Sequence, residues 1–547
     1  MFPVAYATLL LSAMPLNDVA KAAAYYWNTS VSLAVTLPNG ITHAAAGGFN
    51  DRVTGSLVDK DSVIPGGSIC KFITSLGAMR LAETGKLKLD DPIGPLVDPW
   101  LKTQGHPSLK DLWGGDETIA GVTPRQLLSM RGGLPDYDDG VLRRWTVENP
   151  NKDWEPIDFI HNVSKSFLFP PGQGGSYSGI SYVLMGWVLC AATGCSDWTQ
   201  LQQQALIEHG TGFKFDSTIF MTRGPCHQYD VVHQYLYAPA GSSQDSSRAR
   251  AERGARLVGD ARAALSSPPV VRAWDHCQDH TAANPYWYRN AMLKGKVIGQ
   301  RCISTGGAAA CCAAGDTSLS GAMYWMFVAS GAGAQNGTCY FYGSEVAYDR
   351  FSAVATAGRT NAPLRAVDFV DLFDASCLNG WTMGNVATTP SDMTRLYQAA
   401  FNGAIVSQSS LSQMQDWHPL TTGFAKGAPY GLGLFHQPIK IPIVGTDCKG
   451  FDALCKCTLL KGCHFADTQT GHPGLDYGSG FPSVLGHYTG LNASLAAAFN
   501  NGEEPMGMNF TMGGIENNYL TTYVNCRFID AAVHLVHPTF PDLDCGA

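Results

Sequence analysis

Ser68 and Lys71 are the residues of this sequence whose types and spacing best support covalent chemistry. Two residues three positions apart on a helix lie on one face, so the lysine amine can take the proton of the serine hydroxyl as that hydroxyl attacks a carbonyl carbon. The chemistry would be acyl transfer through an acyl-enzyme. The spacing also occurs by chance, and the alternative is a helix-capping serine beside a surface lysine.

The surroundings of the pair favour the chemical interpretation. Ile69, Phe72 and Ile73 place apolar side chains around Lys71, which predicts a buried lysine. Burial disfavours the charged ammonium and lowers a lysine pKa toward the range of a general base. The sequence has no Gly-x-Ser-x-Gly elbow, phosphate-binding loop, His-Glu-x-x-His zinc helix or Gly-x-Gly-x-x-Gly fingerprint. None of these motifs therefore competes with Ser-x-x-Lys as the catalytic motif of this sequence. The chemistry of Ser-x-x-Lys needs no metal ion or organic cofactor.

Apolar spacing and turn residues predict the elements that position the pair. Ile69, Phe72, Ile73 and Leu76 recur at helical intervals until Gly85, so Ser68 stands at or near a helix N-terminus. The alternating segment from Val31 contains Pro-Asn-Gly and predicts a β-hairpin, and LNASLAAAFNNG from Leu491 predicts a buried strand. Further helices are expected in TPRQLLSM from Thr123, in YVLMGWVLCAATG from Tyr182, and between the signal Thr389-Pro390-Ser391-Asp392 and Gly403.

Residues 66–93 resemble the nucleophile segment of class C β-lactamases and of the related D-Ala-D-Ala carboxypeptidases and esterases. Five further segments are similar to blocks of this family and follow its order: VTPRQLLSMRGGLPDY (122–137), FPPGQGGSYSGISYVLMGWVL (169–189), MGNVATTPSDMTRLYQAAFNGAIVS (383–407), YGLGLF (430–435) and GHPGLDYGSG (471–480). The resemblance implies an α+β fold of the β-lactamase/transpeptidase type. A mainly antiparallel sheet would hold the N- and C-terminal strands side by side, flanked by helices, with the active site between it and a mainly helical subdomain.

The resemblance also implies catalytic roles. Ser68 would be the acylated nucleophile and Lys71 its proton acceptor. Tyr177, in the tyrosine place of the second block, would relay protons to the leaving group and from the hydrolytic water, which requires a phenol pKa lowered by nearby cations. His472 would orient or polarise Tyr177 and the substrate. The alternatives are a core tyrosine and a turn or surface histidine, and GHYTG (486–490) is a competing place for the last motif.

Substrate-binding roles follow from the same blocks. The backbone N–H groups of Ser68 and Leu475 would hold the oxyanion, and Gly474 would keep a strand edge open for the substrate backbone. Gly179 stands where the family usually has asparagine, whose amide contacts the substrate, and Pro473 removes a backbone donor from a strand that should bind substrate. These departures place β-lactam or peptidoglycan-type specificity in doubt and leave the nucleophile untouched.

Composition and cysteine usage constrain the setting. Hydrophobic residues make up 45% and charged residues 15% of the 547, as in a globular chain, and 37 Lys+Arg against 45 Asp+Glu leave no basic field for nucleic acid. The 16 cysteines favour disulfides in an oxidising compartment, with metal binding as the competitor for the group between 448 and 463. Cys70 is interpreted as core packing. No stretch is long enough to span a membrane. Acceptors for N-glycosylation occur at Asn28, Asn162, Asn336, Asn492 and Asn509.

The expected organisation is a leader over 1–29 with weak signal-peptide character, followed by one catalytic domain over 30–547. An insertion at about 220–375, containing an Arg/Ala segment (248–265) and a Gly/Ala/Cys-rich segment (306–315), and a Cys-rich loop at about 445–470 interrupt it. We expect a secreted or vesicular hydrolase of a small ester, amide or peptide. The alternative is a catalytically silent descendant that binds a partner. Oligomeric state and disulfide pairing are left open.

Overall fold

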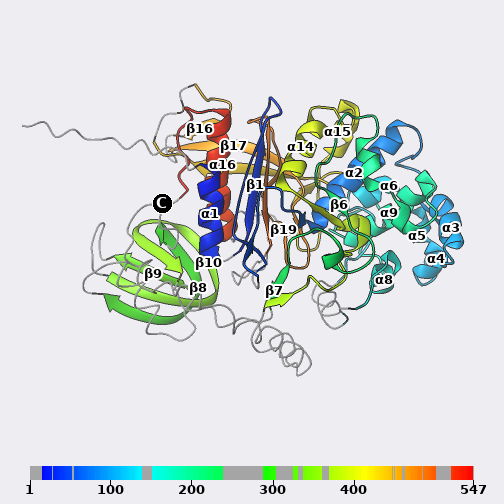
Figure 1. The fold of residues 1–547 in the computed structure, drawn as a ribbon, viewed down its shortest axis with the longest axis horizontal. Coiled ribbons are helices and arrows are strands. Elements are labelled where there is room, and N and C mark those ends of the chain that lie inside the picture. Colours follow the sequence, from blue (N-terminus) through cyan, green and yellow to red (C-terminus); the bar gives the residue numbers. More distant parts are fainter. Residues whose placement is uncertain are drawn as a thin grey trace, which may run out of the picture.

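A central antiparallel sheet organises the protein, with helices on both faces (Figure 1). The structure is a computed structural model that describes residues 15–27, 29–51, 54–137, 149, 151–237, 287–303, 324–329, 337–359, 369–445, 448, 450–458, 462–482, 484–500 and 519–545. The segments 248–265 and 306–315, the first fourteen residues of the expected leader, and Asn28, Asn336 and Asn509 lie outside these ranges. The expected division into leader, catalytic domain and insertion stays a prediction.

Eleven described strands form the central sheet, whose main path runs β13-β14-β15-β17-β20-β21-β1-β2, with β16 on β17, β19 on β21 and β18 on β19. The strands are β1 (Val31–Thr36), β2 (Thr42–Gly47), β13 (His418–Pro419), β14 (Pro429–Tyr430), β15 (Phe435–Pro442), β16 (Cys455–Thr458), β17 (Gly462–Gly471), β18 (Gly474–Leu475), β19 (Gly480–Phe481), β20 (Leu485–Tyr488) and β21 (Ala493–Phe499). β1 and β2 form the predicted hairpin, and β1 pairs antiparallel with β21. The expected adjacency of N- and C-terminal strands is confirmed.

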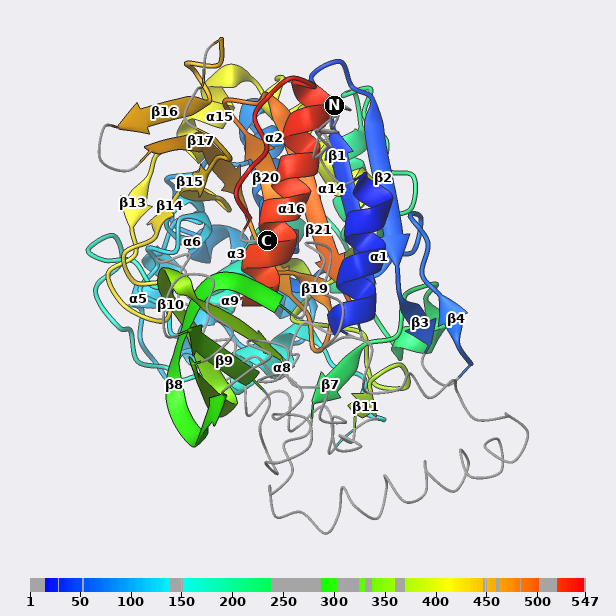
Figure 2. The same cartoon turned by 90° about the vertical axis from the view of Figure 1, so that its left-hand side faces the viewer.

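Helices cover both faces of this sheet. α1 (Leu16–Trp27) and α16 (Tyr519–Val536) lie side by side on one face (Figure 2), and α14 (Pro390–Phe401) packs on the other, against β1, β20 and β21. Every residue of β21 is buried, which explains its continuous run of small and apolar residues and confirms the predicted strand.

A mainly helical region packs beyond α14, at the right of Figure 1. Its helices are α2 (Cys70–Glu83), α3 (Gly94–Thr103), α4 (Leu109–Leu112), α5 (Thr118–Gly121), α6 (Pro124–Leu128), α8 (Pro156–His161), α9 (Gly179–Thr193), α10 (Gln203–Glu208) and α15 (Gln408–Met414). The predicted helices are all present, and Thr123 caps α6 by accepting from Gln126 N–H. The α+β fold with a helical region is thus confirmed.

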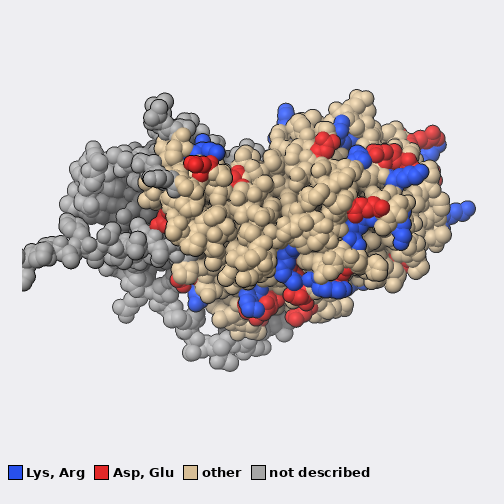
Figure 3. Space-filling view, turned by 90° about the horizontal axis from the view of Figure 1, so that it is seen from above, with Lys and Arg blue, Asp and Glu red and all other residues tan. Residues whose placement is uncertain are grey.

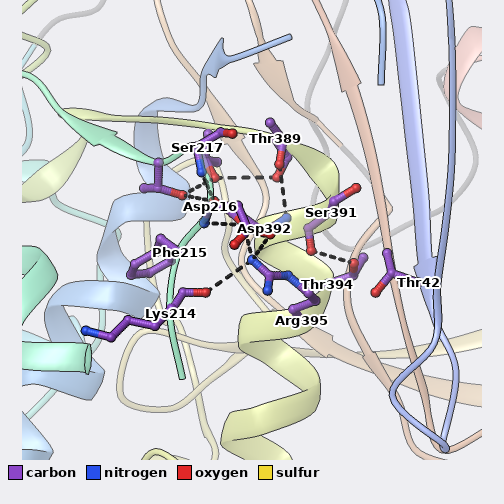
Figure 4. A network of polar contacts seen from close by, with 12 residues as sticks. Thr42, Lys214, Phe215, Asp216, Ser217, Thr389, Ser391, Asp392, Thr394 and Arg395 are labelled. Carbon is purple, nitrogen blue, oxygen red and sulfur yellow. Dashed lines mark hydrogen bonds and ion pairs between the residues drawn. The ribbon is translucent and has the colours of Figure 1, made fainter. Parts of the chain in front are cut away.

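Asp392 joins the two parts near the N-terminus of α14 (Figure 4). Its fully buried carboxylate accepts hydrogen bonds from the backbone N–H groups of Asp216 and Ser217 at 2.9–3.1 Å, and from Thr218 Oγ1 at 2.8 Å. Arg395, one turn later in α14, bonds the same carboxylate. A buried charge is tolerated when it is paired and saturated with donors, so this cluster fixes the segment before β6 (Ile219–Phe220) to α14, which packs on the sheet.

The predicted insertion contains a three-stranded antiparallel sheet of β8 (Trp287–Ile303), β10 (Gly337–Arg359) and β9 (Tyr324–Ala329). It lies on the side of α1 and α16, away from the helical region (Figures 1 and 2). Its two flanking segments meet where β7 (Tyr235–Tyr237) pairs with β11 (Phe369–Asp371) and where Cys226 is bonded to Cys377. The remaining short strands of the described residues are β3 (Phe49–Asp51), β4 (Ser56–Leu57), β5 (Ile64–Pro65) and β12 (Val386–Thr388).

Disulfides pair most of the cysteines in the described part of the chain. The remaining described pairs are Cys190–Cys195, Cys448–Cys455, Cys457–Cys463 and Cys526–Cys545. The group between 448 and 463, for which metal binding was the competing interpretation, is paired in two bridges. The disulfide prediction is confirmed.

The visible surface mixes both signs of charge. In Figure 3, acidic and basic side chains are interspersed and gather mainly over the helical region. Among the described residues, no single helix is both long and apolar enough to cross a membrane. The bent pair Gly179–Thr193 and Trp198–Glu208 reaches that length and composition only together.

A buried histidine predicts how stability depends on pH. Burial lowers the pKa of His487 to about 4, while its ordinary value is 6.5. The unfolded chain therefore takes up the proton first, so the stability contributed by neutral His487 is complete above pH 6.5 and is lost as the pH falls toward 4. We expect His487→Gln to remove up to about 3 kcal/mol of the acid-induced loss in the free energy of unfolding. Urea denaturation at pH 7.5 and 4.5 measures this. His43→Gln, an exposed control, should leave the loss unchanged, and an equal loss in both variants would contradict the assignment.

Candidate active site

The nucleophile turn, Gly66-Gly67-Ser68, packs directly on β18. Gly67 has a φ of +55°, and a Cβ atom built there would lie 2.0 Å from the carbonyl oxygen of Leu475. A Cβ atom on Gly474 would lie 2.3 Å from the carbonyl oxygen of Gly66. Only glycine permits this approach of the two backbones. Gly474 is thus required for the contact between the two backbones, and its role in keeping a strand edge open for the substrate stays a prediction.

Ser68 lies in the short 3₁₀ turn Gly67–Ile69 that leads into α2, as the apolar spacing predicted. Its side chain is half-buried, and it accepts a hydrogen bond from Lys71 Nζ at 2.9 Å. Lys71 is only 1% exposed and also donates to the carbonyl oxygen of Met383 at 2.9 Å. The predicted burial of the lysine is confirmed, and the surface-lysine alternative is wrong.

Tyr177 faces the same amine. Lys71 Nζ lies 5.0 Å from the centre of the Tyr177 ring, close enough for a cation–π contact. The tyrosine precedes α9, whose N-terminus is capped by Ser178, and its neighbour Ser176 forms a bridge with Thr422. These contacts place its phenol ring on the face of α2 that carries Ser68.

Aromatic rings hold Tyr177 from the other sides. Phe435 stacks on it with ring centres 6.1 Å apart, and Phe424 and Tyr430 meet it edge-on at 5.0 and 6.3 Å. Such offset and edge-to-face packing fixes the plane of an aromatic ring. Phe424 is 53% exposed, so the group presents one large apolar side chain to solvent beside the candidate site.

His472 is fully buried, which rules out the surface-histidine alternative. Its Nδ1 lies 2.6 Å from the carbonyl oxygen of Pro473, its Nε2 lies 3.1 Å from Tyr430 Oη, and its backbone N–H donates to Tyr397 Oη. With Nδ1–H donating to that carbonyl, Nε2 accepts from the Tyr430 hydroxyl. Burial, reinforced by the charge of Lys71, lowers the pKa of His472 well below its ordinary value, so the imidazole is neutral at pH 7.

The neutral imidazole changes the expected link to Tyr177. The ring centres of His472 and Tyr177 lie 5.9 Å apart, and the hydrogen-bond partner of Nε2 is Tyr430. His472 therefore orients a tyrosine that in turn packs on Tyr177, while Lys71 supplies the cation. His487, in the competing GHYTG segment, stacks on Phe401 and bonds Ser494.

Gly179 has no room for a side chain. An added Cβ atom would lie 2.5 Å from Met383 Sδ and 2.8 Å from Tyr137 Cε1, and the Gly179 N–H donates to Asp136 Oδ1 at 2.7 Å. The place of the family's asparagine is thus filled by residues from two other segments. This gives a physical reason for the departure seen in the sequence.

The thiol inside the motif is inert. Cys70 is fully buried and lies 3.3 Å from Asn385 Oδ1, and burial raises its pKa to about 11. A thiol with so high a pKa holds almost no thiolate at neutral pH. The core-packing interpretation is confirmed.

Comparison with known proteins shows which family part of the chain is similar to. Residues 17–263 match the family model described as Beta-lactamase. Penicillin-binding protein 4* of Bacillus subtilis (strain 168) is 33% identical over 129 residues, which are 24% of this chain and 25% of that relative. The chain is thus similar to the β-lactamase family over residues 17–263. This matched range contains Ser68, Lys71 and Tyr177 but not His472 or Leu475.

The β-lactamase-related fold extends over most of the chain. D-amino acid amidase from Ochrobactrum anthropi SV3, complexed with L-phenylalanine, is 16% identical with a TM-score of 0.50, covering 94% of this chain and 96% of the amidase. The penicillin-binding protein homologue from Pyrococcus abyssi is 14% identical with a TM-score of 0.48, covering 93% and 75%. At this identity the amidase shows the fold alone. The aligned stretch spans about a quarter of the length of the Bacillus relative.

Several residues that contribute to the site could not be predicted from the sequence. Met383 holds Lys71 through a backbone oxygen, which no side-chain pattern can reveal. Tyr430 lay in a recognised block, YGLGLF, yet its pairing with His472 joins positions 42 residues apart. Tyr137 ends another recognised block and closes on Gly179. The signal for Tyr430 and Tyr137 was their place inside family-like blocks.

The crowding at Gly179 makes a testable prediction. Gly179→Ala should lower the free energy of unfolding by about 1–3 kcal/mol, because the new methyl group overlaps Met383 and Tyr137. In a double-mutant cycle, Gly179→Ala should cost less stability in a Met383→Ala background than in the wild type, as measured by urea denaturation. Gly121→Ala is the matched control, since a Cβ atom at that helical glycine meets nothing within 4 Å. Equal effects at both glycines would contradict the overlap.

Proposed function

We propose that this protein is a serine acyl hydrolase that forms an acyl-enzyme on Ser68 and releases it to water, acting on a small ester, amide or peptide. The observation that carries the proposal is the 2.9 Å contact between Lys71 Nζ and Ser68 Oγ, with the lysine 1% exposed and the serine half-buried. This contact places Nζ to take the hydroxyl proton as the serine oxygen attacks a carbonyl carbon. The half-buried hydroxyl stays within reach of a substrate.

Acylation follows from these positions. Lys71 Nζ takes the proton of Ser68 Oγ as the oxygen attacks the carbonyl carbon of the substrate. The backbone N–H groups of Ser68 and Leu475, which lie on the two closely packed backbones, hold the developing oxyanion. Collapse of the tetrahedral species breaks the bond to the leaving group, which receives a proton through the Tyr177 hydroxyl.

Deacylation reverses the direction of proton transfer. Tyr177 and Lys71 take a proton from the hydrolytic water as it attacks the acyl-Ser68 ester, and the serine leaves with that proton. His472 acts indirectly on the proton transfers, because it orients Tyr430, whose ring packs against Tyr177. None of these steps calls for a redox group.

Specificity is expected to differ from that of β-lactam-recognising relatives. At Gly179, the side chains of Met383 and Tyr137 fill the space that a side-chain amide would occupy. Phe424 adds an exposed aromatic ring beside Tyr177. Esters with an apolar acyl group fit these surroundings better than acylamino β-lactams. The disulfides support a secreted or vesicular location, since such bonds persist in oxidising compartments.

Covalent labelling tests the nucleophile. A fluorophosphonate or fluorescent penicillin probe should label the wild type and leave Ser68→Ala unlabelled, as read by intact-mass spectrometry and gel fluorescence. Equal labelling of both proteins would contradict the nucleophile. An intact fold without Ser68 acylation, and with partner binding unchanged in Ser68→Ala, would instead support the silent binding protein.

The proton relay has its own test. Lys71→Met and Tyr177→Phe should each lower kcat on an activated p-nitrophenyl ester by about 10²- to 10⁴-fold, because each removes a group that moves protons. Lys88→Met, at an exposed lysine, is the matched control and should keep full activity. Retention of wild-type kcat by either relay variant would remove that residue from the mechanism.

A further inference from the structure

The turn after the proposed oxyanion donor contains a buried carboxylate. Asp476 follows Leu475 directly and is only 4% exposed. It accepts a hydrogen bond from Asn379 Nδ2 at 2.7 Å and one from Gln234 Nε2 at 3.2 Å, and its own N–H donates to the carbonyl oxygen of Ser479 at 2.7 Å. A buried carboxylate keeps its charge only with such donors. The position of the 475–476 backbone is thus coupled to two amide side chains.

Gln234 also forms hydrogen bonds with the C-terminal end of the same turn, at Gly478 and Ser479. Its Oε1 accepts hydrogen bonds from Gly478 N–H and Ser479 Oγ, both at 3.2 Å, while its Nε2 donates to Asp476. Ser479 Oγ is also 2.8 Å from the carbonyl oxygen of Pro65, in the strand that leads to the nucleophile turn. One glutamine therefore holds both ends of the turn 476–479.

Both amides lie in the two segments through which the chain enters and leaves the predicted insertion. We call these two segments the root of the insertion. Gln234 precedes β7, Asn379 follows β11, and these two strands pair with each other. The Cys226–Cys377 disulfide joins the same two segments across a sequence separation of 151. The insertion thus enters and leaves the domain at the place that holds Asp476.

This arrangement leaves Leu475 fixed from two sides. On one side its carbonyl lies against Gly67, where no Cβ atom fits, and on the other the next residue is held by Gln234 and Asn379. A catalytic group displaced by about 1 Å can lose about 10²-fold in rate. Loss of the hydrogen bonds to Asp476 would therefore displace the Leu475 N–H and lower the rate of the catalytic step more than the affinity for substrate.

We propose that Gln234 and Asn379 are positioning residues that act through Asp476 to hold the Leu475 N–H as the oxyanion donor. The root of the insertion then sets the efficiency of the catalytic step. This inference rests on the proposed acyl hydrolase function. It assigns the insertion's root a role in the reaction that is independent of anything the insertion itself binds.

Steady-state kinetics on an activated ester tests the proposal. Asn379→Leu and Gln234→Met keep side-chain size and remove the donors. Each should lower kcat by about 10- to 100-fold with KM changed less than threefold, because oxyanion contacts strengthen in the transition state. Affinity for a boronic acid, which forms a tetrahedral adduct, should fall in parallel with kcat. Gln398→Met is the matched control, as Gln398 is a buried glutamine bonded to Asn492 and Ser494.

A second variant separates positioning from loss of fold. Gln234→Glu places a carboxyl group beside Asp476, and two neighbouring carboxylates raise the pKa of one of them. Once protonated, Glu at 234 can again donate to Asp476, so kcat relative to wild type should recover as the pH falls from 8 to 5.5. Gln234→Met should show no such recovery. Circular dichroism at each pH verifies that all variants stay folded.

The outcomes are distinct. A wild type that reacts with fluorophosphonate, together with donor variants that keep wild-type kcat and boronate affinity, would overturn the positioning role alone. A kcat loss in Gln234→Glu that is independent of pH would overturn it as well. A wild type that neither reacts at Ser68 nor turns over esters would overturn the proposed function and this inference with it.

Discussion

The close approach of two backbones, Gly66-Gly67 and Gly474-Leu475, is the constraint on which the candidate site depends. The nucleophile sits at the start of α2, in the helical region, and β18 belongs to the central sheet. A Cβ atom on Gly67 or on Gly474 would overlap the facing backbone at 2.0–2.3 Å, so the two halves of the protein meet through glycines. Backbone groups are less mobile than side chains, and an oxyanion site made from them is set by the fold itself.

Burial then decides the electrostatics around that contact. Lys71 is held between a hydroxyl and a carbonyl oxygen, and His472 is held neutral by the same dry surroundings. The site thus concentrates its positive charge at one amine, next to the hydroxyl that must lose a proton. Aromatic rings pack against Tyr177 without adding charge. Interactions with developing charge are stronger where water is absent.

What the sequence could predict was local. Ser68 lies in the turn that leads into the helix of Lys71, the β1–β2 hairpin closes through a short turn, and β21 is a continuous buried run, so each left a local signal in the sequence. Ordered family-like blocks added Tyr177 and His472. The contact of Lys71 with Met383 could not be predicted, because it uses a backbone oxygen 312 residues away. The filled space at Gly179 and the amides on Asp476 are also long-range, and neither residue type carries a signal for its partner.

The pairing of the first and last strands has a consequence for biosynthesis. β1 lies between β2 and β21, and Ser68 packs beside β18, so the central sheet joins segments that lie far apart in the sequence. At about 5–20 residues per second, roughly 20–80 s pass between synthesis of Ser68 and of Leu475. During that interval the nascent chain holds the helix after Ser68 without the strand that packs against it in the folded protein. The candidate site can therefore assemble only after β18 has been made, which couples its completion to closure of the central sheet.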